Sequence, residues 1–276
     1  MAAPAAAGGA RGAAGPRALS AAPAERRVPV NGALCRVWEA GQGEPLGVLG
    51  GLHGFPRWTP FLARLAEQRR VIVPSLPGFP GATGHDQLDD LPDWVAATLD
   101  LLEGADLRGA DLLGLSVGGA LAAEVAAFAP GFVRRLVLVS PFGLFDEVEP
   151  VADVWAQRPE ELPALLAAHP ERVLETLAVP DGADAVEWQI EQVRAMEAAA
   201  RLLWPTGDRG LRKRLHRIRV PTLLVWGEAD RVVPPSYAKR FAAGLGGPSV
   251  AHLLRGAGHR VDLDAPEELA RIVLAS

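Results

Sequence analysis

The chain has 276 residues, a formal net charge of -5 and a pI of about 5.7. Hydrophobic residues make up 49% of it, enough to fill a large core, which excludes a chain that is disordered throughout. The acidic balance leaves no excess of basic side chains, so neither nucleic acid nor an anionic membrane is expected as a partner. No apolar run has the length that a membrane-spanning helix needs.

Cys35 is the only cysteine, so the chain has neither an internal disulfide nor a Cys-x-x-Cys metal pair. We expect it to be a small buried residue of an early strand, and a lone thiol fits a reducing compartment such as the cytoplasm. Residues 1–24 are mostly Ala, Gly, Pro, Arg and Ser, with no acidic residue before Glu25. They are expected to form a disordered extension, and an organelle-targeting segment is the alternative.

The first structured part of the chain is expected to be a β-hairpin. Asn31-Gly32 separates the strand-like runs 28–30 and 34–38 and is a strong signal for a two-residue turn. Strand and helix patterns then alternate. The predicted strands are 46–49, 70–74, 111–115 and 135–140, and the predicted helices are 59–68, 91–103 and 117–129. Repeated β-α-β order predicts a mostly parallel central sheet with helices on both faces.

This alternation stops at residues 141–212, which carry helix signals and few strand signals. Pro-Glu pairs at Pro159 and Pro170 predict two helix starts, and 184–203 is a long candidate helix. Strand character returns at 222–226 and 249–254, and helices are predicted at 236–245 and 266–274. We therefore predict an α/β core made of residues 25–140 and 213–276, with a helical cap at 141–212.

The most informative motif is Gly114-Leu115-Ser116-Val117-Gly118-Gly119, which lies between a predicted strand and a predicted helix. A turn this tight accepts only glycine two residues before and after the serine, and it strains the serine backbone at the start of the helix. This context is typical of a nucleophile elbow. The structural alternative is a glycine-rich turn with a capping serine. The motif predicts that Ser116 is a nucleophile.

A serine hydroxyl near neutral pH needs a base to take its proton. His259, in a Gly-rich loop between the last predicted strand and the last helix, is the candidate. Its second nitrogen needs an acceptor, and Asp230, just after the strand 222–226, is favoured over Glu228. Asp262 and Asp264 are expected instead to cap the last helix. Ser, then Asp, then His, each after a different strand, is the chain order of hydrolases with such an elbow.

On these motifs the chain resembles the α/β-hydrolase fold family from about residue 28 to residue 276. His53-Gly54-Phe55-Pro56 resembles the oxyanion loop of that family, and residues 221–234 resemble its Trp-Gly-x-x-Asp stretch. Residues 74–79 resemble another family loop, with Ser75 in place of its aspartate. The resemblance implies that the backbone N–H groups of Phe55 and Val117 form the oxyanion hole. It also implies that His53 shapes its loop rather than acting as a base.

Serine at the nucleophile position differs from the aspartate of epoxide hydrolases and haloalkane dehalogenases with this fold. It fits attack on an acyl carbon and hydrolysis of the resulting acyl-enzyme. No metal-ligand cluster or phosphate-binding loop occurs in the sequence, so neither a metal nor a cofactor is expected. The favoured function is hydrolysis of a small or medium apolar carboxylic ester. A small molecule is thus the expected partner, and the oligomeric state stays open.

Candidate substrate contacts come from the loops and from the cap. They are His53, Phe142, Trp155, Trp188 and Trp204. Tryptophans at helical spacing are more often core residues, but a cap must line part of the pocket that it covers.

Three alternatives to an esterase remain. One is a carbon–carbon bond hydrolase of vinylogous diketones. Residues 140–144 resemble a stretch at a strand end in some of those enzymes. However, Arg260 stands where they commonly have a tryptophan directly after the catalytic histidine. A lactonase or acyltransferase would use the same residues. A non-catalytic ligand-binding protein of the same fold belongs to another class.

Overall fold

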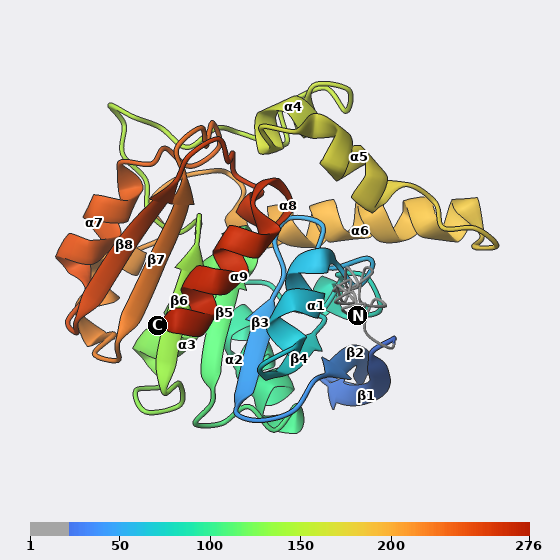
Figure 1. Ribbon diagram of the computed structural model, residues 1–276, viewed down its shortest axis with the longest axis horizontal. Helices are drawn as coiled ribbons and strands as arrows, with labels where there is room; N and C mark the ends of the chain where they lie inside the picture. Colours follow the sequence, from blue (N-terminus) through green and yellow to red (C-terminus); the bar gives the residue numbers. More distant parts are fainter. Residues whose placement is uncertain (1–21) are drawn as a thin grey trace, which may run out of the picture.

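The computed structural model describes residues 22–276, which form one eight-stranded sheet in the order β1-β2-β4-β3-β5-β6-β7-β8 (Figure 1). β1 pairs antiparallel with β2, and β2 antiparallel with β4, while the pairs from β4 to β8 are parallel. The strands are β1 (Ala24–Val30), β2 (Ala33–Ala40), β3 (Pro45–Leu49), β4 (Arg70–Pro74), β5 (Asp111–Leu115), β6 (Arg135–Val139), β7 (Thr222–Gly227) and β8 (Ser249–Leu254). The predicted fold class is confirmed.

The hairpin of β1 and β2 turns at Asn31 and Gly32, both with positive φ (47° and 79°), as a two-residue primed turn requires. β1 begins at Ala24, four residues before the predicted start. Its first residues are mostly exposed and carry no hydrophobic signal, although they pair with β2 throughout. The extension predicted for residues 1–24, with its targeting alternative, falls mainly on residues 1–21, which lie outside the described residues.

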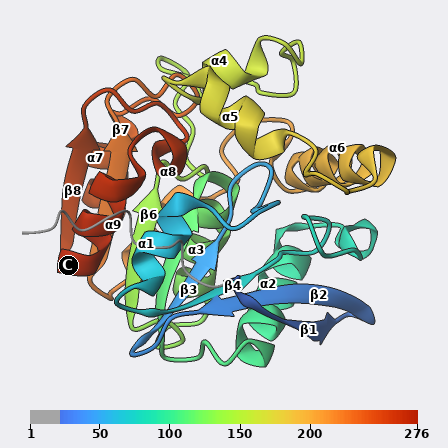
Figure 2. The same ribbon diagram turned by 45° about the vertical axis from the view of Figure 1, so that its right-hand side comes forward.

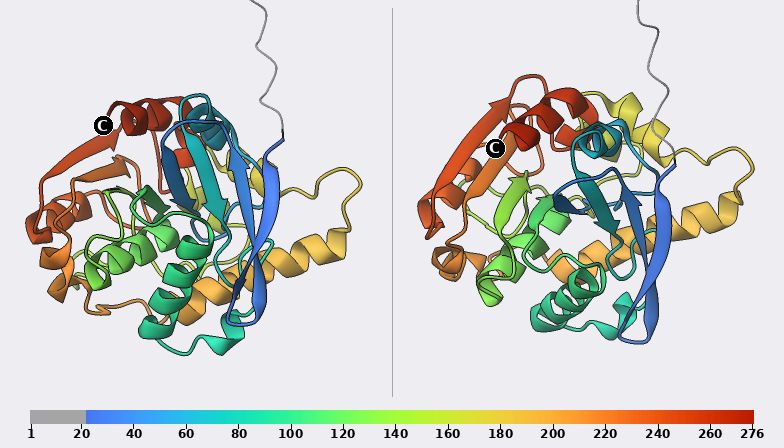
Figure 3. Two further views of the ribbon diagram at one scale, coloured as in Figure 1. Left: turned by 90° about the horizontal axis from the view of Figure 1, so that it is seen from below. Right: turned by 60° about the horizontal axis from the view of Figure 1, so that its bottom comes forward.

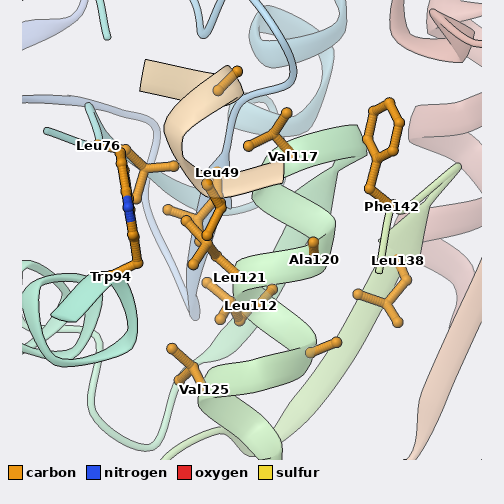
Figure 4. Close-up of a cluster of buried hydrophobic side chains, with 14 of the residues drawn as sticks. Leu49, Leu76, Trp94, Leu112, Val117, Ala120, Leu121, Val125, Leu138 and Phe142 are labelled. Carbon is orange, nitrogen blue, oxygen red and sulfur yellow. The ribbon is translucent and has the colours of Figure 1, made fainter. Parts of the chain in front are cut away.

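Helices cover both faces of the sheet (Figures 1 and 3). α1 (Pro60–Ala66) and α9 (Pro266–Ala275) pack on one face, and α2 (Leu91–Gly104), α3 (Ser116–Phe128) and α7 (Tyr237–Gly244) on the other. Neighbouring strand residues point to opposite faces, so Leu112 and Leu113 belong to different apolar clusters. The cluster around α3 includes Leu49, Trp94, Leu121 and Leu138 (Figure 4).

Residues 141–212, which we call the cap, contain helices and no strand, and they lie beside the loops that follow the parallel strands (Figures 1 and 2). The cap helices are α4 (Leu162–Leu166), α5 (Pro170–Leu177) and α6 (Ala185–Leu203). α6 begins after Asp184, whose carboxylate accepts from the N–H groups of Val186 and Glu187, and it extends beyond the core (Figure 2). The predicted helix start at Pro159 is wrong. That proline lies in a turn, and α4 begins only at Leu162.

Short helical turns complete the chain, and the sequence patterns predicted none of them. They are α8 (Val261–Asp264) and the 3₁₀ turns η1 (His85–Gln87), η2 (Leu211–Lys213) and η3 (Leu215–Arg217). α8 is only four residues long, too short to show a helical period. It directly follows Arg260 and so fixes the exit of the loop that carries His259.

Candidate active site

Ser116 lies at the turn between β5 and α3, with a φ of 52°. A β-carbon on Gly114 would stand 2.4 Å from the carbonyl oxygen of Gly118, and one on Gly119 2.8 Å from Cβ of Pro141. A non-glycine residue seldom adopts a positive φ unless the surrounding structure imposes it. The glycines therefore make the close approach possible, and the turn holds Ser116 in the strained conformation expected of an elbow.

A continuous hydrogen-bonded chain starts at the Ser116 hydroxyl. Its Oγ lies 2.7 Å from Nε2 of His259, and Nδ1 of His259 lies 3.0 Å from Oδ2 of Asp230. With its proton on Nδ1, the imidazole donates to the Asp230 carboxylate and accepts from the serine hydroxyl. The structure thus brings together the three residues that the sequence singled out, from the ends of β5, β7 and β8.

Asp230 is held in place by its other carboxylate oxygen. Oδ1 accepts from the N–H groups of Val232 (2.8 Å) and Val233 (3.0 Å), and Nε1 of Trp226 donates to the Val233 carbonyl at 3.1 Å. The competing acid, Glu228, is exposed, and its carboxylate lies 3.9 Å from Nε of Arg255. The turn after β7 therefore directs Asp230 toward the histidine and Glu228 away from it.

The loop after β3 passes beside the serine. The N–H of Gly118 donates to the carbonyl of Gly50 at 3.0 Å, and a β-carbon on Gly51 would stand 3.2 Å from Cβ of Ser116. Phe55 belongs to this loop, and Val117 follows the serine in the first turn of α3, where a backbone N–H has no intrahelical acceptor. Both predicted oxyanion donors thus belong to the backbone segments that flank Ser116.

Two buried basic side chains belong to the loops of the site, His53 in the loop of Phe55 and Arg260 directly after His259. Burial, with the nearby positive charge of Arg260 as the second cause, lowers the pKa of His53 to about 3, so its imidazole is neutral at neutral pH. Arg260 binds both carboxylate oxygens of Asp262, at 2.9 and 2.8 Å. Burial opposes the charge of Arg260, but the carboxylates of Asp262 and Asp264 outweigh it and raise its pKa.

The prediction that Asp262 and Asp264 cap the last helix is wrong. No side chain caps α9, which begins after Ala265 with Pro266 at its first position. Asp262 instead neutralises Arg260, and Asp264 accepts hydrogen bonds from backbone N–H groups of the cap and of the histidine loop. The two carboxylates of this short segment therefore bind the histidine loop and the cap rather than the start of α9.

Of the aromatic candidates, Phe142 lies against the site. Its ring meets the His259 imidazole edge-on, with centroids 5.5 Å apart. Trp155 and Trp188 use their indole N–H groups inside the cap, on the carbonyls of Met196 (3.0 Å) and Leu177 (2.7 Å). Trp204, directly after α6, is 55% exposed. Their roles in substrate binding stay predictions.

The site is closed in this conformation. Ser116 and His259 are each only 2% exposed. A narrow cavity of about 30 Å³ runs from Phe142 along α3, with room for about two water molecules. Its walls are mainly apolar and include Ala120, Leu121, Leu144, Val151, Leu202 and Leu203. Entry of a substrate therefore requires the cap or these walls to move.

Neither a metal centre nor a membrane span is found in the described part of the chain. Among residues 22–276, no group of three or more His, Cys, Asp or Glu residues is arranged to hold a metal ion. No helix within the same range combines the length and apolar character needed to cross a bilayer.

A mostly parallel sheet with an elbow serine hydrogen-bonded to a histidine, which is itself hydrogen-bonded to an aspartate, defines the class of α/β-fold serine hydrolases. Sequence comparison agrees, because the profile of the alpha/beta hydrolase family matches residues 52–272. The chain belongs to this family, and it is an enzyme of the α/β-fold serine hydrolase type.

Two relatives and one solved structure illustrate the similarity. The chain is 31% identical to the dihydrolipoyllysine-residue acetyltransferase component of an acetoin cleaving system from Pseudomonas putida, over 92% of this chain and 69% of the relative. It is 28% identical to a 2-hydroxy-6-oxo-2,4-heptadienoate hydrolase from Pseudomonas putida, over 90% of this chain and 94% of that enzyme. The crystal structure of a meta-cleavage product hydrolase, CumD, shares the fold with a TM-score of 0.74 at 20% identity, over 91% of this chain and 96% of that one.

Proposed function

We propose that the protein hydrolyses carboxylic esters of apolar small molecules, with Ser116 as the nucleophile. His259 is the general base, and Asp230 orients it. The observation that carries this proposal is the unbroken hydrogen-bonded chain from Oγ of Ser116 through His259 to Asp230. No step of this chemistry requires a cofactor.

In the proposed reaction, Nε2 of His259 takes the hydroxyl proton while Oγ of Ser116 attacks the ester carbonyl carbon. Negative charge develops on the carbonyl oxygen, and the N–H groups of Phe55 and Val117 stabilise it. The protonated His259 then donates its proton to the departing alcohol, which leaves an acyl-enzyme. His259 next deprotonates a water molecule that attacks the acyl carbon, and the acid and free Ser116 are released.

The surroundings of the reacting atoms favour an apolar substrate. The Phe142 ring packs against His259, and the narrow cavity beyond it is lined mainly by apolar side chains. An apolar acyl or alcohol group gains free energy when it leaves water for such a surface.

A second candidate is carbon–carbon bond hydrolysis on the same residues. The similarity to a 2-hydroxy-6-oxo-2,4-heptadienoate hydrolase, which extends over nearly the full length of both chains, favours it. Arg260 follows the catalytic histidine where those enzymes commonly have tryptophan. A third candidate reaction is acyl transfer to an acceptor other than water. The relative that is an acetyltransferase component is the reason to include this reaction in the test.

A substrate panel with matched variants tests the proposal. Wild type and Ser116→Ala are compared on p-nitrophenyl esters, lactones and vinylogous diketones, with and without a competing alcohol. We expect the highest kcat/KM on an apolar ester, no turnover by the alanine variant, and fluorophosphonate labelling of the wild type alone. Preferred cleavage of a diketone would replace the ester proposal by the second candidate. Absence of labelling and turnover in folded wild type would indicate a binding protein.

We further propose that the enzyme acts in the cytoplasm, because Cys35 is a single buried thiol that fits a reducing compartment. Burial raises the pKa of this thiol to about 11, which suits an inert core residue.

A further inference from the structure

The amino end of the cap helix α5 is bound to the loop that carries His259. The N–H groups of Ala168 and His169, just before α5, donate to Oδ2 and Oδ1 of Asp264 at 2.8 and 3.0 Å. The same Oδ2 accepts from the N–H of Gly258 at 2.8 Å. Gly258 directly precedes His259 in the sequence, so one carboxylate joins the cap to the backbone beside the proposed base.

The carboxyl end of α5 is bound to the loop that carries Phe55. Nη2 of Arg57 donates to the carbonyl of Ala178, the residue after α5. The Arg57 guanidinium also lies 5.5 Å from the ring centroid of Trp188, whose indole N–H donates to the Leu177 carbonyl. Arg57 is two residues from Phe55, the proposed oxyanion donor. Arg57 therefore joins the carboxyl end of α5 to the proposed oxyanion loop, as Asp264 joins its amino end to the histidine loop.

The charges of the two anchors match the dipole of the helix between them. A carboxylate lies at the amino end of α5 and a guanidinium at its carboxyl end, the arrangement that a helix dipole favours. Arg172, in the first turn of α5, also donates to the carbonyls of Leu263 and Asp264, at 2.8 and 2.7 Å. Figures 1 and 2 show α5 between α8 and the start of α6.

The contact is close enough to couple the two parts mechanically. A β-carbon on Gly258 would stand 2.9 Å from the backbone nitrogen of Ala168, so the histidine loop and the cap touch through backbone atoms. The N–H of Arg260 also donates to the carbonyl of Leu166 at 2.8 Å. Ser116 and His259 are only 2% exposed, so the site must open to admit a substrate, and this contact lies where the cap meets the histidine loop.

We propose that α5 couples closure of the cap to alignment of the site, with Asp264 and Arg57 as positioning residues. When α5 docks, Asp264 fixes the backbone before His259 and Arg57 fixes the loop of Phe55. When α5 lifts, both loops lose their anchors together, so the bound substrate reacts only in the closed state. This inference rests on the proposed function for the roles of His259 and Phe55.

The test compares Asp264→Asn, Arg57→Gln and the double variant by kinetics on an apolar p-nitrophenyl ester. We expect each single variant to lower kcat about ten- to a hundredfold, with a smaller change in KM, because it misaligns reacting groups. The kcat of the double variant should be no lower than that of the less active single variant, because both substitutions release the same helix. Matched controls are Glu267→Gln and Arg158→Gln, both exposed, which should leave kcat unchanged.

Hydrogen–deuterium exchange supplies a readout that a purely local role would not change. Arg57→Gln should raise exchange in residues 255–262, although Arg57 itself binds Ala178 and lies near Trp188, and Asp264→Asn should raise it in residues 53–58. If each variant raises exchange only in its own loop and the kcat losses multiply, the coupling is refuted. Arg57→Lys keeps the charge, so it should restore part of the protection that residues 255–262 lose in Arg57→Gln. If Asp264→Asn fails to fold, this comparison still tests whether Arg57 acts on the histidine loop. Hydrogen–deuterium exchange does not depend on turnover. If Ser116 proves not to be the nucleophile, the proposed function fails, but the exchange data still test whether α5 couples the two loops.

Discussion

Gly118 lies against Gly50 so closely that a β-carbon on Gly118 would stand 2.5 Å from the Gly50 carbonyl oxygen. Its N–H donates to that same oxygen at 3.0 Å. One glycine thus serves the elbow turn around Ser116 and also sets the distance to the loop that leads from β3 to Phe55. The nucleophile and the proposed oxyanion loop are fixed relative to each other through backbone, without an intervening side chain.

Gly118→Ala should therefore disrupt folding or shift the loop. The new methyl group meets a backbone carbonyl that cannot rotate away, and we expect a loss of about 3 kcal/mol in the free energy of unfolding, the upper end of the usual cost of overpacking. Urea denaturation measures it. Gly207→Ala is the control, because a β-carbon there would have only one neighbour within 4 Å, at 3.9 Å. Equal stability of the two variants would contradict the packing argument.

Asp230→Asn should lower kcat on the order of 10⁴-fold, the size of the same change in a serine protease, because the amide favours the wrong tautomer of His259. Glu228→Gln should have little effect, since that side chain is exposed and near Arg255. Steady-state kinetics on one ester measures both. A larger loss from Glu228→Gln would show that the orienting acid is misassigned.

The sequence was sufficient for those parts of the structure whose signals are local. The Asn31-Gly32 turn, the buried strands β4 and β5, and the elbow glycines each act within a few residues. The Ser116–His259–Asp230 arrangement was also predictable, because in a parallel sheet the residues that follow neighbouring strands gather at one edge.

Contacts between distant segments were not predictable in this way. Arg57 bonds to a residue 121 positions away, and Asp264 to residues 95 and 96 positions away. Neither periodicity nor a short motif records such pairs. The position of Asp264 shortly before Pro266 therefore predicts a helix cap, because the local signal is the only one that the sequence offers there.

His53→Gln should flatten the dependence of stability on pH in the acid range. Below pH 6.5 the unfolded chain protonates His53, while the folded chain does so only near its lowered pKa of about 3. The unfolded state thus binds one more proton between these values, and the folded state loses about 1.4 kcal/mol for each pH unit as the pH falls.

Urea denaturation at pH 7, 6 and 5 measures this slope in wild type and in the variant. His216→Gln, at an exposed histidine, is the control and should keep the wild-type slope. Other groups contribute equally to all three proteins, so the difference in slope isolates His53. Parallel curves for wild type and His53→Gln would mean that His53 is protonated normally in the folded protein. Because His53 is neutral above about pH 4, any change of activity with pH above pH 5 comes from the titration of another group.

Phe142→Leu should change acyl preference, because the ring stands between His259 and the narrow apolar cavity. The smaller side chain widens the passage, so kcat/KM should rise for longer acyl groups relative to acetate. A series of p-nitrophenyl esters measures the ratio. Phe128→Leu, the same change at a side chain that is 46% exposed, should leave the ratio unchanged. If both variants keep the wild-type preference, the acyl group lies on another side of Ser116.

Phe55→Pro and Phe55→Leu separate the backbone of the proposed oxyanion loop from its side chain. Proline has no N–H and so removes the donor, whereas leucine keeps the donor and fills most of the buried volume of the ring. Position 55 precedes Pro56 and already favours extended backbone, which proline tolerates. Loss of one oxyanion donor lowers kcat on the order of 10² to 10³-fold, about 3 to 4 kcal/mol of transition-state stabilisation.

The leucine variant should lose mainly stability, roughly 1 kcal/mol, because Phe55 is a core residue. Circular dichroism first establishes that both variants fold. Equal kcat values in the two folded variants would place the donor elsewhere in the site.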